Sequence, residues 1–151
     1  MSLVPITPCL PATQPEVLKK LFVAQERILK EEQVPIHTQH LIHGGMYART
    51  ITMPPGTVLV GALIKRPTVV ITVGSGRVLF GQEWADIDGY QVLPASKDRK
   101  QVFFSRGALV ITMLFPTSAK TVEEAEEEFT DEAELLLSRR QDLNSTVVTG
   151  E

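Results

Sequence analysis

The sequence has few of the cysteine and histidine residues that form disulfides and metal sites, and it has no long apolar run. Its 151 residues include one cysteine, Cys9, three histidines and one tryptophan. A single cysteine cannot form an internal disulfide, so the chain suits a reducing compartment. No apolar run approaches the ~20 residues that span a bilayer, and the N-terminal segment lacks the charged and apolar regions of a secretory signal. We therefore expect a soluble cytoplasmic protein that does not enter a membrane.

Charge and motifs exclude further classes of protein. The formal net charge is −3 and the isoelectric point is about 5.7. No basic cluster marks a nucleic-acid site, so we expect no DNA or RNA partner. The sequence contains no Ser-His-Asp pattern, phosphate loop, Cys-x-x-Cys pair or dinucleotide fingerprint. It thus indicates no catalytic residue and no cofactor, and it favours a protein without catalytic activity.

The centre of the chain predicts strands. Two short runs rich in Val, Ile and Thr, 57–64 and 68–73, are bounded by glycines, which favours strands over a helix. Their nearly continuous apolar character predicts strands that are covered on both faces, by the rest of the core or, on the second face, by a subunit interface. Residues 46–53 alternate as a strand does, and hairpin signals follow at 74–76, 88–89 and 106–107. About eight short strands within 46–116 predict a mainly β protein, as a sandwich or barrel.

A helix is predicted on each side of the β region. Thr13 and Glu16 form a capping box ahead of an apolar stripe, and this helix should end before Pro35. Thr121 and Glu124 form a second capping box ahead of a strongly acidic helix, whose charged face we interpret as exposed to solvent. The predicted organisation is an extended arm at 1–12, a helix and histidine-containing connector at 13–45, the β domain at 46–116, the acidic helix at 117–140 and a flexible tail at 141–151.

All three histidines lie in the connector, as His37, His40 and His43. Three imidazoles can hold a catalytic zinc ion. On a helix their spacing of three would place them on one broad face, whereas on a strand His37 and His43 would share a face and His40 would point away. No His-Glu-x-x-His pattern is present, and hydrogen-bonded histidines on a loop or surface are the alternative to a metal site.

The glycine-framed strand pair resembles the first sequence motif of the cupin superfamily, in which a glycine, a His-x-His pair, a glutamate and a second glycine follow at set intervals. The two glycine positions fall on Gly56 and Gly76. The histidine positions fall on Ala62 and Ile64, and the glutamate position falls on Val69. The resemblance implies a jelly-roll fold without the cupin metal ligands, because these side chains have no lone pairs for a metal ion. We therefore expect an apolar floor where cupins bind an ion.

The second cupin motif is similar to residues 89–96, one residue short, with Gly89, Pro94 and Ser96 in place and Arg99 near its histidine position. The whole chain is also similar to small cupin-like proteins of phages and prophages. These resemblances imply a single cupin-like β domain flanked by helices. For a phage protein, they imply a location in the host cytoplasm or in the virion.

Three functions remain as alternatives. The first is a non-catalytic binding or assembly module, as a homo-oligomer or a component of a phage-related assembly. The second is a protein that binds a small anionic ligand, such as a phosphate or carboxylate, at the barrel mouth. The third is a metal-dependent cupin enzyme that uses the three histidines from outside the usual motif. The residues predicted to bind an anion, if they are not ordinary surface polar groups, are Tyr47, Arg49, Lys65, Arg66, Arg99 and Lys100.

Overall fold

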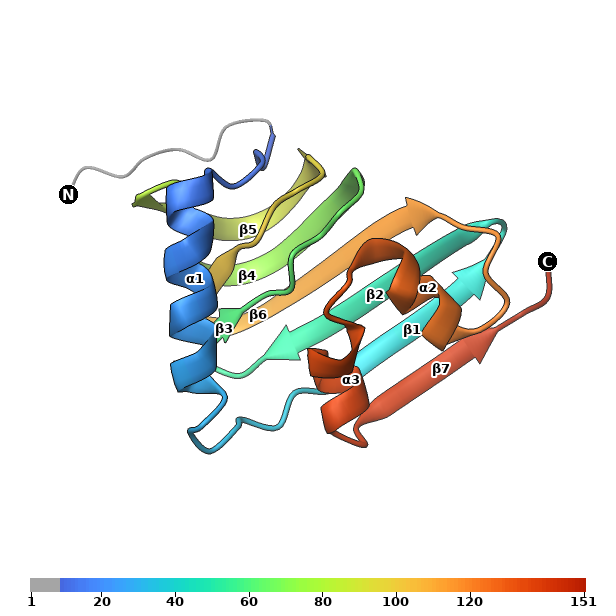
Figure 1. Ribbon diagram of the computed structural model, residues 1–151. Coiled ribbons are helices and arrows are strands. Elements are labelled where there is room, and N and C mark those ends of the chain that lie inside the picture. The colour runs from blue at the N-terminus through green and yellow to red at the C-terminus, as the bar shows by residue number, and fades with distance from the viewer. Residues whose placement is uncertain (1–8) are drawn as a thin grey trace.

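The structure is a computed structural model that describes residues 9–151, apart from the Phe80 side chain. Its elements are α1 (Pro15–Ile28), β1 (Thr38–His43), β2 (Met46–Met53), β3 (Val58–Val60), β4 (Thr68–Phe80), β5 (Glu83–Ala95), β6 (Val102–Pro116), α2 (Val122–Phe129), the 3-10 helix η1 (Ala133–Leu135), α3 (Leu137–Arg140) and β7 (Asn144–Val148). Strands predominate, with helical segments before and after the main strands (Figure 1). This confirms the predicted mainly β class with N-terminal and C-terminal helices.

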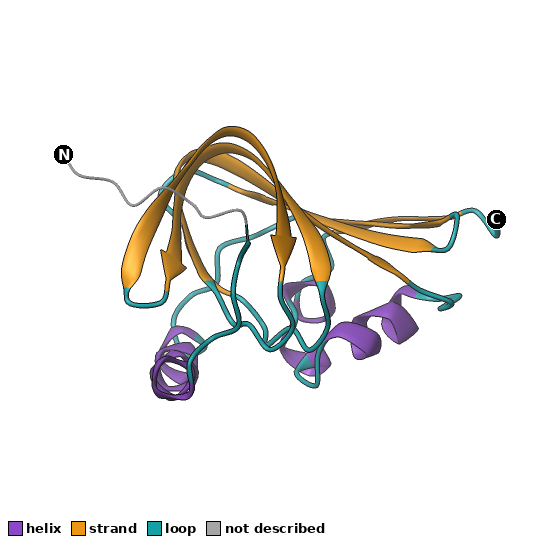
Figure 2. Cartoon of the chain, turned by 90° about the horizontal axis from the view of Figure 1, so that it is seen from above, coloured by secondary structure: helices purple, strands orange, loops and turns teal. Residues whose placement is uncertain are grey.

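All seven strands belong to one sheet. Its order is β5-β4-β6-β2-β1-β7, and β3 pairs with the first residues of β6. The neighbouring strands are antiparallel, except that β1 and β7 are parallel. The helices all lie on one side of the sheet, here called the inner face (Figures 1 and 2). The opposite side, the outer face, is not covered by any helix of residues 9–151.

The glycine-containing segments predicted as hairpins are bends within long strands. β4, β5 and β6 run without reversal through 74–76, 88–89 and 106–107. Gly74 lies opposite Gly89, and the β4–β6 register shifts between Gly74 and Gly76. A Cβ atom on Gly74 would lie only 2.2 Å from the Ala108 carbonyl oxygen. The hairpin predictions were wrong because glycine here allows close backbone approach where the sheet arches (Figure 2).

The two central runs are shorter or more exposed than predicted. Within 57–64 only β3 forms a strand, followed by one isolated bridge. In β4 the Val70 side chain is buried, whereas Val69 and Val73 are exposed on the outer face. Alternate residues of a strand point to opposite faces, and the helices of the described chain pack only on the inner one, so within this chain the predicted second cover is not formed by a helix.

The two predicted capping boxes have different outcomes. At α1 the N-cap is Gln14, and the Thr13 hydroxyl instead donates to the Lys100 carbonyl oxygen at 3.0 Å and accepts from the Lys100 nitrogen at 2.7 Å. At α2 the Thr121 hydroxyl accepts from the Glu124 nitrogen at 3.2 Å, as predicted. Thr13 therefore ties the start of α1 to the loop between β5 and β6.

The acidic helix predicted at 117–140 is interrupted. α2 ends at Phe129, and Thr130 has an extended backbone with φ −152° and ψ 148°. The Thr130 hydroxyl accepts from the Glu132 nitrogen at 3.1 Å, and η1 and α3 follow. Such side-chain bonds to the nearby backbone compete with the helical pattern, which explains why a continuous helix was a wrong prediction.

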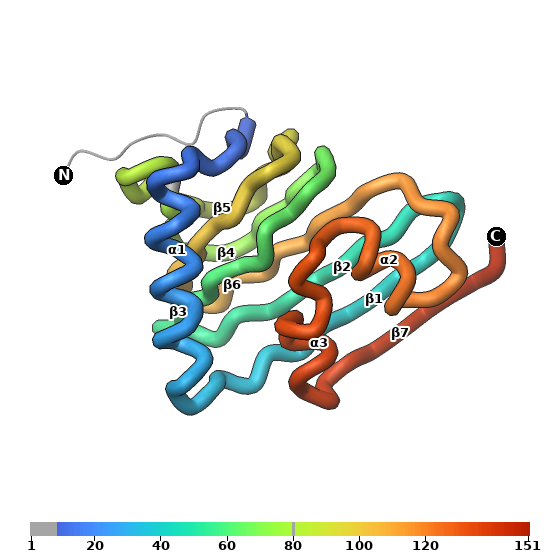
Figure 3. Tube along the Cα trace, viewed as in Figure 1, coloured from blue at the N-terminus to red at the C-terminus, as the bar shows by residue number. Residues whose placement is uncertain are grey.

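The last residues, predicted as a flexible tail at 141–151, contain β7, which lies along β1 (Figure 3). The Thr38 nitrogen donates to the Leu143 carbonyl oxygen at 2.9 Å, just before β7 begins. β1, predicted as part of a connector, is itself a strand. The tail prediction was wrong because β7 depends on the edge of β1, roughly a hundred positions earlier in the chain. β1 itself pairs with the adjacent β2 across the turn at 44–45.

Two clusters of buried hydrophobic side chains lie beneath the inner face. One includes Met53, Val78 and Leu109 near the bend. The other includes Phe115 and Phe129, whose rings meet edge to face with centroids 6.0 Å apart. The arm predicted at 1–12 lies outside the described residues up to position 8. None of the helices in residues 9–151 is long and apolar enough to cross a membrane.

Candidate functional site

A cavity of about 250 Å³ lies between the inner face of the sheet, α1 and the C-terminal helical segment. Three arginines line it: Arg49 from β2 and Arg99 from the loop between β5 and β6 are buried, and Arg140 at the end of α3 is exposed. The lining found in the described part of the chain contains no histidine, cysteine, serine, aspartate, lysine or tyrosine. Most of the wall is apolar, and it includes Ile51, Val70, Phe103, Ile111 and Met113.

Arg49 is buried, and a carboxylate compensates its charge. Its Nη1 atom donates to Glu126 Oε2 at 2.8 Å and to the Tyr47 hydroxyl at 3.3 Å, while Nη2 donates to Ser138 Oγ at 2.9 Å. The guanidinium also lies 5.6 Å from the centroid of the Phe129 ring. Arg49 thereby connects β2 to α2 and α3 through a buried ion pair, which is costly to break on one side only.

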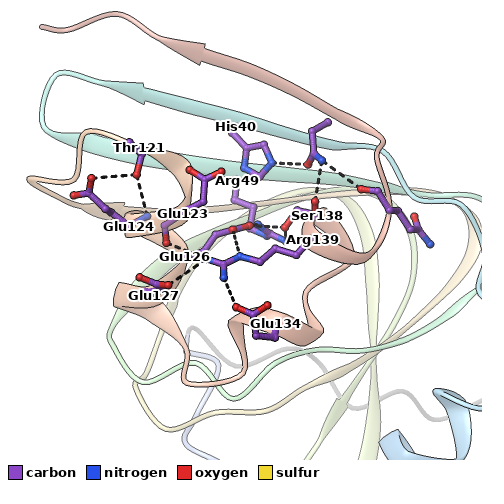
Figure 4. Close-up of polar contacts among 12 residues, drawn as sticks. His40, Arg49, Thr121, Glu123, Glu124, Glu126, Glu127, Glu134, Ser138 and Arg139 are labelled. Atoms are coloured by element: carbon purple, nitrogen blue, oxygen red, sulfur yellow. Dashed lines mark hydrogen bonds and ion pairs between the residues drawn. The ribbon is translucent and has the colours of Figure 1, made fainter.

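Glu126 is the central acceptor of this network (Figure 4). Besides Arg49, it accepts from Arg139 Nε at 2.9 Å and from the Ser138 hydroxyl. Burial raises the pKa of this carboxyl, but these hydrogen bonds and the charge of Arg49 outweigh burial and hold the pKa below its ordinary value. Glu126 is therefore ionised at neutral pH and is matched by two arginines.

The network continues through Tyr47 and His40 to β7. His40 Nδ1 lies 2.7 Å from the Tyr47 hydroxyl, and His40 Nε2 lies 2.8 Å from Asn144 Oδ1. The Asn144 amide nitrogen donates to the carbonyl oxygens of Ser138 and Gln141, so Oδ1 is an acceptor and His40 Nε2 carries the proton. Burial lowers the pKa of His40 and raises the pKa of Tyr47. Both groups are therefore neutral at neutral pH, and His40 joins β1, β2 and β7.

Arg99 is 3% exposed and forms no ion pair with a carboxylate of the described chain. Its Nη1 donates to the Ser96 carbonyl oxygen at 2.7 Å, its Nη2 donates to Thr68 Oγ1 at 2.6 Å, and Nη2 lies 3.7 Å from the Met113 sulfur. Burial lowers the pKa of Arg99 to about 10, against the opposing influence of Cys9. The guanidinium remains charged at neutral pH, so the cavity wall carries a buried positive charge that only neutral acceptors contact.

Lys100 is also buried, but it faces α1 and is not part of the cavity wall. Its Nζ atom lies 3.1 Å from Glu132 Oε2 and donates to Gln25 Oε1 at 2.5 Å. Burial lowers the pKa of Lys100. For Glu132 burial raises the pKa, but the Leu63 backbone N–H and the bonds from Gln25 and Lys100 outweigh it, and the pKa lies below its ordinary value. Hydrogen bonds from Gln25 of α1 and from the Leu63 nitrogen to Glu132 link this ion pair to α1 and to the loop that contains Leu63.

Two of the residues predicted to bind an anion lie away from the cavity. Lys65 pairs with Asp131 at 2.7 Å, and both side chains are largely exposed. The Arg66 guanidinium lies 4.4 Å from the centroid of the Phe115 ring. Of the six predicted residues, Arg49 and Arg99 line the cavity, and Tyr47 contacts Arg49. Lys65, Arg66 and Lys100 lie outside the cavity wall.

The three histidines do not converge on one point. His37 and His43 are exposed and contact the hydroxyls of Ser145 at 2.8 Å and Thr149 at 2.6 Å, whereas His40 is buried on the inner face. This is the alternation that the strand interpretation predicts. Among residues 9–151, no cluster of three or more His, Cys, Asp or Glu side chains could hold a metal ion, so the geometry gives no support to the alternative of displaced histidine ligands.

The positions that resemble cupin metal ligands do not fit a metal ion. Ala62 and Ile64 line the cavity, so its wall is apolar there, as expected from the sequence. Val69 is 40% exposed on the outer face and cannot reach the cavity, because β4 alternates. None of these three side chains offers a lone pair to a metal ion.

Sequence reasoning missed Glu126 and Ser138. The acidic face was interpreted as solvent-exposed, yet Glu126 follows Val122 by four positions and lies on the same helical stripe as Ala125 and Phe129. This spacing was the signal available in the sequence. Ser138 carries no such signal, because its role depends on the break between α2 and α3.

Comparisons with known proteins give a likeness in fold. No protein-family model matches the chain, and no curated protein sequence matches it. A cupin-2 domain from Rhodospirillum rubrum is 18% identical with a TM-score of 0.48, over 61% of this chain and 68% of that chain. A cupin superfamily protein from Desulfitobacterium hafniense is 11% identical with a TM-score of 0.48, over 61% of this chain and 86% of that chain. At TM-scores below 0.5 and such low identity, no ligand, metal or reaction is carried over.

Proposed function

We propose that the protein is a non-catalytic binding module that holds a small anion in its inner cavity, against Arg99. The observation that carries this proposal is the burial of the Arg99 guanidinium without a carboxylate partner in the described chain. Buried charges are normally paired, because an uncompensated charge loses its hydration. An anion in the cavity supplies the missing charge. The absence of histidine, cysteine and serine from the described lining supports binding without catalysis.

The charges around the cavity favour a ligand with one negative charge. Arg49 is matched by Glu126, and Lys100 is matched by Glu132. Among the buried cations of the described residues, Arg99 is the one without a carboxylate partner. A dianion such as a phosphate ester would bring a second charge with no buried partner, which costs free energy. A monocarboxylate balances the site.

The size and lining of the cavity favour a short apolar body behind that carboxylate. A volume of about 250 Å³ corresponds to roughly eight water-sized groups. Its wall is built mostly from aliphatic and aromatic side chains, which gain from contact with hydrocarbon. The ligand class is therefore a monocarboxylate of about eight non-hydrogen atoms with an aliphatic tail.

The position of the head group follows from the weakest contact of Arg99. Its Nη2 atom faces the Met113 sulfur at 3.7 Å, and a thioether is a weak acceptor. Met113 lines the cavity, so a carboxylate oxygen that reaches Arg99 from the cavity replaces this contact with a charge-assisted hydrogen bond. The bonds from Arg99 to Ser96 and Thr68 hold the guanidinium in place for it.

The test uses hexanoate as the probe and 1-hexanol as its uncharged counterpart. Hexanoate should raise the midpoint of thermal unfolding of the wild-type protein, because a ligand of the native state stabilises it, and hexanol should give a much smaller shift. Arg99→Met should abolish the hexanoate shift. Arg77→Met, the same change on the outer side of β4, should retain it. Equal binding by the Arg99→Met variant, or no hexanoate binding by the wild type, would contradict the proposal.

A further inference from the structure

The outer face of the sheet carries an apolar row that crosses six strands. The strand registers place these side chains next to one another in a single line: Pro94, Val69, Leu114, Ala48, Leu41 and Val147. Val69, Leu41 and Val147 are at least 40% exposed. A second row beside it contains apolar, Thr, Gln and Ser side chains. An apolar strip that extends across a whole sheet is unlike the scattered apolar residues of an ordinary surface.

No Asp, Glu, Lys or Arg occupies these rows, although 22% of the chain is charged. The contrast lies on the other side of the bend. There the outer side carries Asp86, which pairs with Arg77 at 3.6 Å and with Arg106. The same strands thus have an ion-paired half, as expected of a surface in water, and a charge-free half.

We infer that the charge-free half of the outer face is covered by a second copy of this chain. A charged partner would bury its charges against a surface that offers no counter-charge, which costs free energy. A second copy presents the same charge-free surface, and two-fold symmetry pairs a patch with itself. The face therefore matches its own copy by charge and polarity.

The area of the face suits a dimer. Strands lie about 4.8 Å apart and alternate residues about 6.8 Å apart, so about three outward residues on each of the six strands cover roughly 600 Å². Two copies would bury roughly 1,200 Å², which is the lower limit of stable interfaces. The first eight residues of the chain are too few to cover this face. Fully extended they reach about 28 Å and, one strand wide, cover roughly 130 Å².

The experiment measures molecular mass by analytical ultracentrifugation of the full chain over a range of micromolar concentrations. The wild type should be a dimer. Val69→Lys should weaken it roughly a hundredfold, because two-fold symmetry places the new charge in the interface twice. Val23→Lys is the control, since Val23 and Val147 are both 55% exposed but Val23 lies on α1. It should leave the mass unchanged. If Val69→Lys fails to fold by circular dichroism, Val147→Lys on β7 replaces it with the same expected result.

Two outcomes would overturn the inference. One is a monomeric wild type at every concentration; deletion of residues 1–8 then shows whether that segment is the cover, because its removal would allow dimers to form. The other is a dimer that survives both Val69→Lys and Val147→Lys as well as it survives Val23→Lys. Neither outcome depends on Arg99, so the dimer and the anion site succeed or fail separately.

Discussion

Arg49 and Arg99 are two buried arginines that line one cavity, and they differ in what faces them. Arg49 meets the Glu126 carboxylate at 2.8 Å, whereas Arg99 meets a carbonyl oxygen, a hydroxyl and a thioether. Burial is therefore not what separates Arg49 from Arg99, for which we propose a ligand. The difference lies in whether the fold already supplies the counter-charge.

The largest expected effect on stability comes from breaking the ion pair between Arg49 and Glu126. Glu126→Gln should lower the free energy of unfolding by about 3–5 kcal/mol, because it leaves the buried Arg49 charge without its partner. The neighbouring Glu127→Gln is the control, since Glu127 is 64% exposed and only approaches Arg139 at 3.7 Å. It should change stability by less than about 0.5 kcal/mol. Urea unfolding measures both variants, and equal effects would show that Glu126 is not the structural partner of Arg49.

A smaller effect separates the two arginines directly. Arg49→Met should lower the free energy of unfolding by about 1.5–3 kcal/mol, because Glu126 loses a charged donor but keeps Arg139 and Ser138. Arg99→Met should leave stability unchanged or raise it by about 1 kcal/mol or more, since an apolar side chain replaces an unmatched buried charge. Denaturant unfolding without ligand tests this sign. A large loss of stability in Arg99→Met would mean that its three neutral contacts already compensate its charge.

The smallest effect is the pH dependence of the paired network. The pKa of His40 is below its ordinary value of 6.5 in the folded chain, so its contribution to stability is complete above pH 6.5 and is lost as the pH falls below it. The pKa of Glu126 is below 4.5, so its contribution is lost only as the pH falls further, through its folded value. Stability should decline in two stages on acidification. His40→Gln should remove the first stage and retain the second, as measured by unfolding at a series of pH values.

The absence of a first stage in the wild type would contradict the assignment of a neutral His40 between Tyr47 and Asn144. Arg99 adds nothing to this pH profile, because its pKa of about 10 keeps it charged throughout the acidic range. The first stage therefore reports on the Arg49 network, whereas Glu132, whose pKa also lies below its ordinary value, contributes to the second stage with Glu126.

Local patterns predicted a large part of this fold. β2 spans Met46–Met53, as the alternation predicted, and the Thr121 cap starts α2 where the capping box placed it. The strand alternative for the histidines, with His37 and His43 on one face and His40 on the other, was also confirmed. These features depend on residues close together in the chain, so they could be predicted from the sequence.

The glycines show where local information ended. Glycine permits both a tight turn and close contact between strands, so Gly74 and Gly89 indicated hairpins. Their pairing across β4 and β5 makes them part of a bend instead. In the same way, the low apolar content of 141–151 predicted a tail, but part of this segment pairs with the open edge of β1 and forms β7.

By itself, the sequence determined the mainly β class, the helices at its ends, the apolar wall at Ala62 and Ile64 and the candidate status of Arg49 and Arg99. The tertiary structure decided that Glu126 matches one of these arginines and that, among residues 9–151, the hydrogen-bond acceptors around the other are neutral. The pairing could not be read from the chain, because Arg49 and Glu126 lie on different elements, and Coulomb energy depends on distance and burial and not on sequence separation.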